Sequence, residues 1–161
     1  MQMLFYRLFG SVLLLASAFF AAKYLNKKAE EVLSETDSFY RLIKQIKLEV
    51  DSFSLPISKI LSRIDKKLLV GCGYAEDEPP KSLDALLSSI KFKGERCREL
   101  LVGFSSDFGN SYREEELRKL SYYEELLKNE RERLAAELPA KKKLNLTLAL
   151  AAALGIVILL I

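Results

Sequence analysis

The sequence predicts an all-α protein in which an antiparallel helical bundle lies between an N-terminal and a C-terminal transmembrane helix. Three observations predict this class. Apolar residues crowd both ends of the 161-residue chain, they recur every three or four residues in between, and lysines stand on the inner side of both apolar runs. We therefore expect an N-terminal transmembrane helix with a basic flank at 1–28, a cytoplasmic helical bundle at 29–140, and a basic flank with a C-terminal transmembrane helix at 141–161.

The composition narrows the possible functions. The chain carries 25 Lys and Arg against 22 Asp and Glu, and this net charge of +3 does not favour nucleic-acid binding. It contains no histidine, the most common general base and metal ligand. Without histidine, the widely separated Cys72 and Cys97 cannot form a zinc site of ordinary ligand count. We predict no metal and no cofactor, and we expect both thiols to stay reduced in a cytoplasmic domain, with one disulfide between them as the alternative.

The N-terminal apolar run extends from Leu8 to Ala22, and it lengthens to about 20 residues if Arg7 snorkels to the interface. A cleaved signal peptide is the alternative, with Arg7 as its positive region and "ASA" as its cleavage site. The bulky Phe19 and Phe20 directly after "ASA" favour a retained membrane helix. Both readings stay open at this point.

The C-terminal apolar run extends from Leu144 to Ile161. Its length of about 18 residues gives roughly 27 Å of helix, close to the hydrocarbon thickness of about 30 Å. A core helix of a soluble protein would show a polar face, whereas no residue after Thr147 is polar. We predict a second membrane span here.

The flanking lysines predict the orientation. Cationic residues mark the cytoplasmic side of membrane spans, and both lysine groups face the middle of the chain. We therefore predict a cell-membrane protein with a cytoplasmic middle domain and both short tails across the membrane. Each lysine near anionic headgroups contributes about 1 kcal/mol to membrane attraction. The membrane-flanking lysines are Lys23, Lys27, Lys28, Lys141, Lys142 and Lys143.

Two helices are predicted for the first half of the middle. One extends from about Ala29 to Ser52 on a single apolar stripe, and Pro56 suits the first turn of the next. The stripe comprises Val32, Phe39, Ile43, Ile46, Val50 and Phe53, and the face of the second helix comprises Ile57, Ile60, Leu61, Ile64 and Leu68.

"VGCGYAEDEPPKS" is predicted to be a loop, because four Gly and Pro residues punctuate it. No strand precedes it and no helix with a phosphate-binding lysine follows, so we do not read it as a phosphate loop. Two short helices separated by a turn at Gly94 come next. Their apolar faces are Leu83, Leu86, Leu87 and Ile90, and Cys97, Leu100, Leu101 and Phe104.

The last helix is expected to begin near Ser111, which forms an S-x-x-E capping box with Glu114. Glu114, Glu115 and Glu116 lie in its first turn, where the helix dipole favours them. We expect this helix to continue past Pro139 into the second span. Its apolar stripe comprises Leu117, Leu120, Tyr123, Leu127, Leu134 and Leu138.

No catalytic constellation is recognisable in the sequence. No histidine is present to activate a serine or cysteine, and the paired carboxylates are runs on helix surfaces. We predict a non-enzymatic membrane component that binds other proteins. The surface that we predict to bind a partner is an exposed acidic face made by Asp107, Glu114, Glu115 and Glu124.

The order of segments and three short stretches resemble the stage III sporulation protein AB family of endospore-forming bacteria. "RLIKQIKLEVDSFSLPISKIL", with Glu49 and Pro56, is similar to the family's long helix and the break that follows it. "FSSDFG", which ends at Gly109, resembles its turn before the last long helix. "LGIVILLI", with Gly155, resembles its final span.

The resemblance implies a relative of the platform proteins of type II secretion and type IV pili. Such a protein would belong to the channel complex that joins mother cell and forespore, in the mother-cell membrane around the forespore. Its expected partners are a cytoplasmic secretion-type ATPase and the other membrane proteins of the channel, with no nucleic acid and no small-molecule substrate.

Two alternative functions would place the chain in other classes of protein. A membrane-bound enzyme or lipid-handling protein would show perturbed carboxylates in a pocket or a lipid-sized apolar cavity. A cleaved, exported, tail-anchored protein would expose Cys72 and Cys97 to an impermeant reagent in intact cells.

Overall fold

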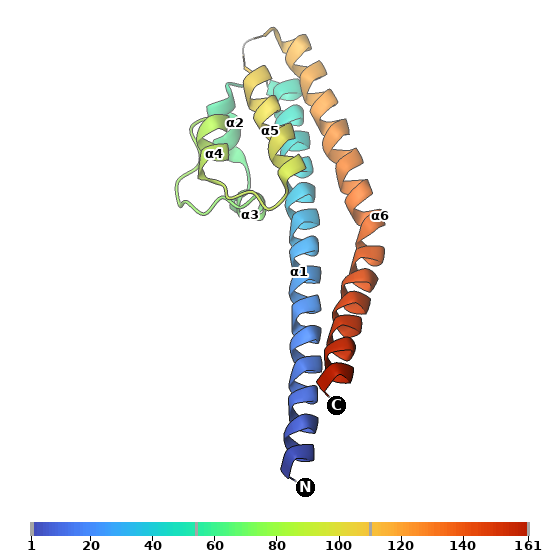
Figure 1. Cartoon of the computed structure of the whole chain (residues 1–161). Helices are drawn as coiled ribbons and strands as arrows, with labels where there is room; N and C mark the ends of the chain where they lie inside the picture. The colour runs from blue at the N-terminus through green and yellow to red at the C-terminus, as the bar shows by residue number, and fades with distance from the viewer. Residues whose placement is uncertain (1, 54, 110, 161) are drawn as a thin grey trace. The chain divides into compact units, whose positions relative to one another are not determined.

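The computed structural model describes residues 2–53, 55–109 and 111–160, and its regular structure within these ranges is helical (Figure 1). The predicted all-α class is confirmed. Side chains are described from residue 9 to residue 159, so the expected snorkelling of Arg7 lies outside the described part. The helices are α1 (Gln2–Phe53), α2 (Ile57–Arg63), α3 (Lys66–Gly71), α4 (Leu83–Ser89), α5 (Glu95–Asp107) and α6 (Arg113–Leu160).

The chain divides into two compact units, and both α1 and α6 contribute to each of them. We call the first the terminal unit, which comprises Met1–Glu30 and Ala135–Ile161. The second, Glu31–Leu134, is the central unit.

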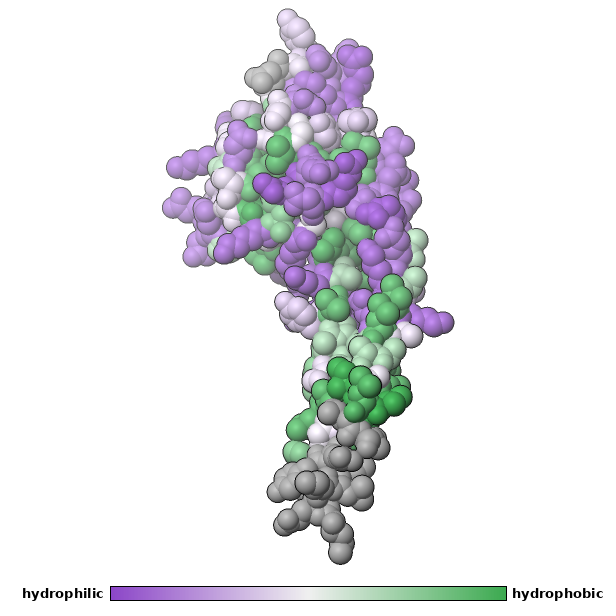
Figure 2. Space-filling view, in the orientation of Figure 1, coloured by the Kyte–Doolittle hydropathy of each residue, from purple (hydrophilic) through white to green (hydrophobic). Residues whose placement is uncertain are grey.

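In the terminal unit, the first part of α1 and the last part of α6 lie side by side (Figure 1). The side chain of Asn145 donates a hydrogen bond to Asn26 at 2.9 Å, and Lys142 forms an ion pair with Glu30. Most large apolar side chains of this unit point outward, as the green surface in Figure 2 shows. Both α1 and α6 are long and apolar enough to cross a membrane, and very little of their apolar stretches is buried.

The central unit has one hydrophobic core, to which α1 contributes most of the predicted stripe. Phe39, Ile43, Ile46 and Val50 are buried, and charged side chains dominate the outside of the unit (Figure 2). The expectation for Phe53 is wrong: its side chain is 61% exposed because α1 ends at this residue.

The segment predicted as a single second helix is two helices. Ile64 adopts extended backbone angles after α2, although its side chain stays buried. Asp65 then caps α3, because its carboxylate accepts the backbone N–H of Lys67 at 2.9 Å. Pro56 occupies the N-cap position of α2, one residue before the helical position that we expected.

The two short helices occur where the sequence predicts them, but the loop begins two residues later than predicted, because Val70 and Gly71 belong to α3. Gly73 has a φ of 93°, a left-handed conformation that glycine adopts without a steric penalty. Ser82 caps α4 by accepting the N–H of Ala85 at 3.1 Å. Gly94 is the N-cap of α5, and Cys97 is buried in the core as expected.

The start of α6 differs from the predicted capping box. The carboxylate that accepts backbone N–H groups there belongs to Glu116 and not to Glu114, while the hydroxyl of Ser111 accepts from Lys119 at 2.7 Å. Glu116 is four residues before the buried Leu120, so its side chain lies on the core side and reaches back under the turn. The helix continues through Pro139 into the terminal unit.

Candidate functional site

A groove of about 340 Å³ lies where the C-terminal end of α1, the start of α2 and the turn between α5 and α6 meet (Figure 1). Its wall is mainly apolar, and its polar groups come from the turn and from the first residues of α6. The lining residues are Val50, Leu55, Pro56, Ile57, Phe108, Gly109, Ser111, Arg113 and Glu116.

Glu116 is the buried charged residue of this groove, with 6% of its surface exposed. Its Oε1 accepts the backbone N–H groups of Gly109 at 3.1 Å and Ser111 at 2.9 Å. Its Oε2 is buried and has no hydrogen-bond partner among the described residues. A buried carboxylate oxygen without a donor is unfavourable, so this atom is where the groove can gain from an additional hydrogen bond.

Two cations at the start of α6, Arg113 and Lys119, donate hydrogen bonds to groups other than this carboxylate. Arg113 donates to the carbonyl of Val50 at 3.3 Å and to the carboxylate of Asp51 at 2.8 Å. Lys119 donates to the carbonyl of Asp107 at 2.6 Å, and its Nζ lies 3.9 Å from Oε1 of Glu116. Neither contact uses Oε2 of Glu116.

A second buried carboxylate, that of Glu35 in α1, binds the turn between α4 and α5. It is 3% exposed and accepts the backbone N–H of Lys93 at 3.0 and 3.1 Å and that of Gly94 at 3.0 Å. Burial raises its pKa, and the hydrogen bonds from Lys93 and Gly94 partly oppose that change. Both oxygens are occupied by backbone donors, so the group is placed to hold the turn and not to exchange protons.

The two cysteines are free and buried, with 0% of Cys72 and 1% of Cys97 exposed. Burial and the nearby Glu35 raise the pKa of Cys97 to about 12, and burial raises the pKa of Cys72 above its usual range. Such thiols react slowly on either side of a membrane. Labelling of these native cysteines therefore does not test export, contrary to our expectation.

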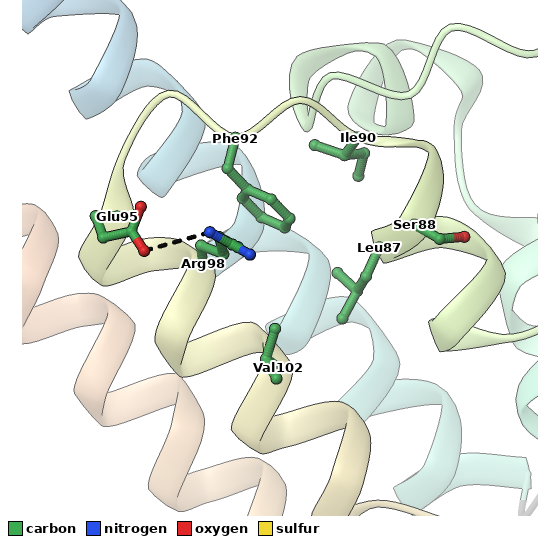
Figure 3. A pocket seen from close by; sticks show the side chains of 7 residues that line it. All are labelled: Leu87, Ser88, Ile90, Phe92, Glu95, Arg98 and Val102. Carbon is green, nitrogen blue, oxygen red and sulfur yellow. Dashed lines mark hydrogen bonds and ion pairs between the residues drawn. The ribbon is translucent and has the colours of Figure 1, made fainter.

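An open hollow of about 470 Å³ lies between α4 and α5 (Figure 3). The side chains of Leu87, Ile90 and Val102 surround it, and Phe92 stacks on Phe39 of the core with ring centroids 5.7 Å apart. Glu95 and Arg98 on its rim form an ion pair at 3.4 Å. The charged groups of this hollow thus neutralise each other.

The titratable side chains do not converge on a metal centre. Among the described residues, no group of three or more His, Cys, Asp or Glu side chains is placed to hold a metal ion. The two buried carboxylates contact different turns, Glu35 the one before α5 and Glu116 the one before α6. A paired acid and base is therefore not formed from them.

The family model for stage III sporulation protein AB matches residues 80–161, half of the chain. The chain belongs to the stage III sporulation protein AB family. No curated protein and no solved structure matches it. Membership in the stage III sporulation protein AB family implies a role in sporulation. The matched residues comprise α4, α5 and α6.

Of the four positions that carried the family resemblance, Pro56 and Gly109 are brought to the same groove, and Glu49 and Gly155 lie elsewhere. Gly109 has a φ of 104°, which favours glycine. Glu49 forms an ion pair with Arg63 at 3.5 Å. Gly155 is exposed on α6 in the terminal unit. Only Gly109 and Gly155 fall within the residues that the family model matches.

The four acidic residues that we predicted as a partner surface do not share one face. Glu115 and Glu124 are nine residues apart, which places them on opposite sides of a helix with about 3.6 residues per turn. Glu124 is only 19% exposed at its side chain and pairs with Lys47 at 2.8 Å. Asp107 accepts a hydrogen bond from Tyr123 at 2.5 Å, while Glu114 is exposed. Their role in binding stays a prediction.

The membrane-flanking lysines lie in the terminal unit. Lys142 pairs with Glu30, Lys141 lies 3.2 Å from Glu137, and the ammonium of Lys28 lies 6.0 Å from the ring centroid of Tyr24. Of the six membrane-flanking lysines, those that are exposed and carry no ion pair to an acidic side chain among the described residues are Lys23, Lys27, Lys28 and Lys143.

We did not predict from the sequence that the carboxylates of Glu35 and Glu116 are buried, although their positions in the apolar stripes indicate it. Glu35 precedes Phe39 by four residues, and Glu116 precedes Leu120 by four. Each glutamate therefore occupies a position at which the apolar stripe predicts a buried apolar residue. A carboxylate at such a position needs donors from the backbone or from another segment.

Proposed function

We propose that this protein is a non-enzymatic membrane component of the channel complex between mother cell and forespore, where it couples a cytoplasmic secretion-type ATPase to the membrane assembly. Membership in the stage III sporulation protein AB family carries this proposal. The coupling to an ATPase rests on the family's likeness to type II secretion and type IV pilus platform proteins. The other expected partners are the remaining membrane proteins of the channel.

The proposed arrangement has membrane segments at 1–28 and 141–161 and a cytoplasmic domain at 29–140. Exposed apolar side chains on α1 and α6 of the terminal unit support membrane insertion, because water would solvate them poorly. Lysine groups at the inner end of each segment support the cytoplasmic side for the domain. By family likeness, the membrane is that of the mother cell around the forespore.

The surroundings of the two buried carboxylates, those of Glu35 and Glu116, also support a role in binding other proteins. The carboxylate of Glu35 is engaged by backbone donors of a turn, as in a structural contact. The groove beside Pro56 and Gly109 is mainly apolar and contains one carboxylate oxygen without a donor. Such a surface suits recognition of another protein more than turnover of a substrate.

Copurification tests the coupling proposal. The full-length chain, tagged and coexpressed with the secretion-type ATPase of the complex, is isolated from membranes in mild detergent. We expect the ATPase to be retained, and a chimera in which an unrelated helical domain replaces residues 31–134 to lose it. Equal recovery with the chimera, or no recovery with either protein, would contradict ATPase coupling.

Topology needs a separate measurement. Cysteine is placed at the exposed Lys128 (K128C) in a chain that carries C72A and C97A. We expect an impermeant maleimide to label K128C only after the cells are permeabilised. Labelling in intact cells would place the central unit on the outside.

A further inference from the structure

We propose that the groove beside Glu116 is a docking site for a partner-protein segment that presents an arginine or lysine between apolar side chains. The proposal deepens the proposed function and rests on it, because it names the surface through which a protein-binding component would hold its partner. It starts from one buried atom, Oε2 of Glu116, which lacks a donor among the described residues.

The geometry around Glu116 leaves this buried oxygen without a donor of its own. Its Oε1 is fixed by the N–H groups of Gly109 and Ser111, and these two bonds hold the carboxylate in one orientation. A donor reaches Oε2 only when the groove side chains that cover it move aside, but the carboxylate that it then meets is already positioned and needs no further ordering. A charge-assisted bond to such an acceptor is stronger than a neutral one.

The electrostatics favour a cation as the donor. Arg113, the positive residue of the groove wall, is paired with Asp51, so it does not compensate Glu116. Lys119 contacts both Glu115 and Glu116, at 3.8 and 3.9 Å, which leaves two carboxylates facing one ammonium. An arginine or lysine of the partner would supply a second positive charge for these two carboxylates, whereas the phosphate groups of lipids or nucleic acids would be repelled.

The apolar wall specifies what must flank the cation. Leu55, Ile57 and Phe108 line the groove, each of them partly exposed. Two larger aromatic side chains stand next to these segments along the chain and point to solvent, Phe53 with 61% and Tyr112 with 89% exposure. Apolar side chains on both sides of the incoming cation would cover this surface, as in the anchors of protein–protein interfaces.

A peptide titration tests the proposal with the full-length chain in lipid nanodiscs. The probe is a capped leucine–arginine–leucine tripeptide, and the matched peptide carries norleucine in place of arginine. Methyl NMR signals of Val50 and Ile57 report on the groove, and those of the exposed Val70 and Val102 serve as controls. We expect shifts of the groove methyls only, with the norleucine peptide at least tenfold weaker.

Variants locate the interaction. Glu116→Gln keeps an acceptor for Gly109 and Ser111 but replaces the second oxygen by a donor, so the turn is retained and the arginine peptide loses its acceptor. We expect E116Q to weaken binding at least tenfold and E125Q, at an exposed position of α6, to leave it unchanged. Thermal unfolding of both variants verifies that they fold. The comparison of the two peptides on the unmodified chain needs no variant at all.

Three results would overturn the docking site: no shift at the groove methyls, equal affinity for both peptides, or equal affinity of E116Q and the unmodified chain. If one of these occurs while the ATPase still copurifies, the proposed function stands and only its surface is wrong. If the peptide binds as expected and no ATPase is retained, the groove serves a different protein.

Discussion

The carboxylate of Glu35 in α1 accepts the backbone N–H of Gly94 at 3.0 Å, so a residue of the first helix caps the N-terminus of α5. The N-cap residue itself is a glycine without a side-chain acceptor. This cap from another helix satisfies one of the unpaired N–H groups at the start of α5 and, at the same time, fixes where α5 packs on α1. Stability and packing of the central unit are therefore coupled through one buried side chain.

Removal of this carboxylate should destabilise the central unit. In Glu35→Ala, the N–H groups of Lys93 and Gly94 lose their acceptor in a buried place, and we expect a loss of about 2–4 kcal/mol in the free energy of unfolding. Denaturant unfolding of the full chain in detergent measures it. The matched control is Glu31→Ala, one turn earlier on α1, where a half-exposed ion pair with Lys93 at 3.3 Å should contribute less than about 1 kcal/mol. Equal effects of the two variants would refute the capping role.

The same residue predicts a dependence on pH. Burial raises the pKa of Glu35 above its ordinary value of 4.5, so the folded state binds its proton more tightly than the unfolded state does. Stability should therefore fall as the pH rises from about 4.5 through the raised pKa, relative to Glu35→Gln, which does not titrate. Unfolding curves of both proteins across this range measure the difference. A difference that stays constant with pH would show that the pKa of Glu35 is not raised.

Close packing at Gly94 should make this position sensitive to a single methyl group. A Cβ there would lie 3.0 Å from Cγ1 of Val32, and the φ of −109° adds no backbone strain of its own. We expect Gly94→Ala to cost about 1–2 kcal/mol by overpacking. Val32→Ala in the same chain should recover part of this loss, and a double-mutant cycle measures the coupling. Additive effects would mean that the two residues are not in steric conflict.

The native thiols should resist alkylation until the central unit unfolds. Cys72 and Cys97 are buried, and the raised pKa of each keeps its thiolate population small near neutral pH. We expect labelling by a maleimide to be at least about 100-fold slower than in denaturant. K128C, at an exposed position of α6, provides the rate of an accessible thiol on the same protein. Native thiols that react as fast as K128C would contradict their burial.

Charge reversal separates folding from binding among the acidic residues of α6. Glu124→Lys would replace the carboxylate that pairs with Lys47 at 2.8 Å by a second positive charge at a partly buried position, and we expect a loss of about 1–2 kcal/mol in stability. Glu114→Lys, at an exposed position, should change stability by less than about 0.5 kcal/mol. Thermal unfolding followed by circular dichroism compares them. A sporulation defect in E114K without a change in stability would support a role in binding.

The elements that sequence predicted well are those in which many residues give the same signal. Several residues contribute to each of the two terminal apolar runs and to each apolar stripe, so the pattern stays recognisable when one position departs from it. These stripes include Ile43, Leu101 and Leu120. The break between α2 and α3 depends on the single cap at Asp65, which lies inside an otherwise helical apolar pattern. One side-chain hydrogen bond of this kind can end one helix and begin another, and the spacing of apolar residues does not reveal it.

The polar contacts were harder to predict because their donors are backbone groups. Every non-proline residue carries an N–H, so nothing in the identities of Lys93 or Ser111 marks them as the groups that Glu35 and Glu116 bind. The buried carboxylates were visible only as misfits in the stripes. The groove required the start of α2 and the turn before α6 to come together, and no local pattern specifies that long-range contact.

The hydrogen bond between Asn26 and Asn145 limits how copies of this protein recognise one another in a bilayer. Amide side chains on membrane helices form hydrogen bonds with one another, either within one chain or between chains. Asn26 and Asn145 lie at the lysine-flanked ends of the two apolar segments, and the bond between them engages one polar group of each amide inside the chain. Substitution of one of them by leucine would release the other, and would turn a self-contained pair of helices into one that associates laterally as its density in the membrane increases.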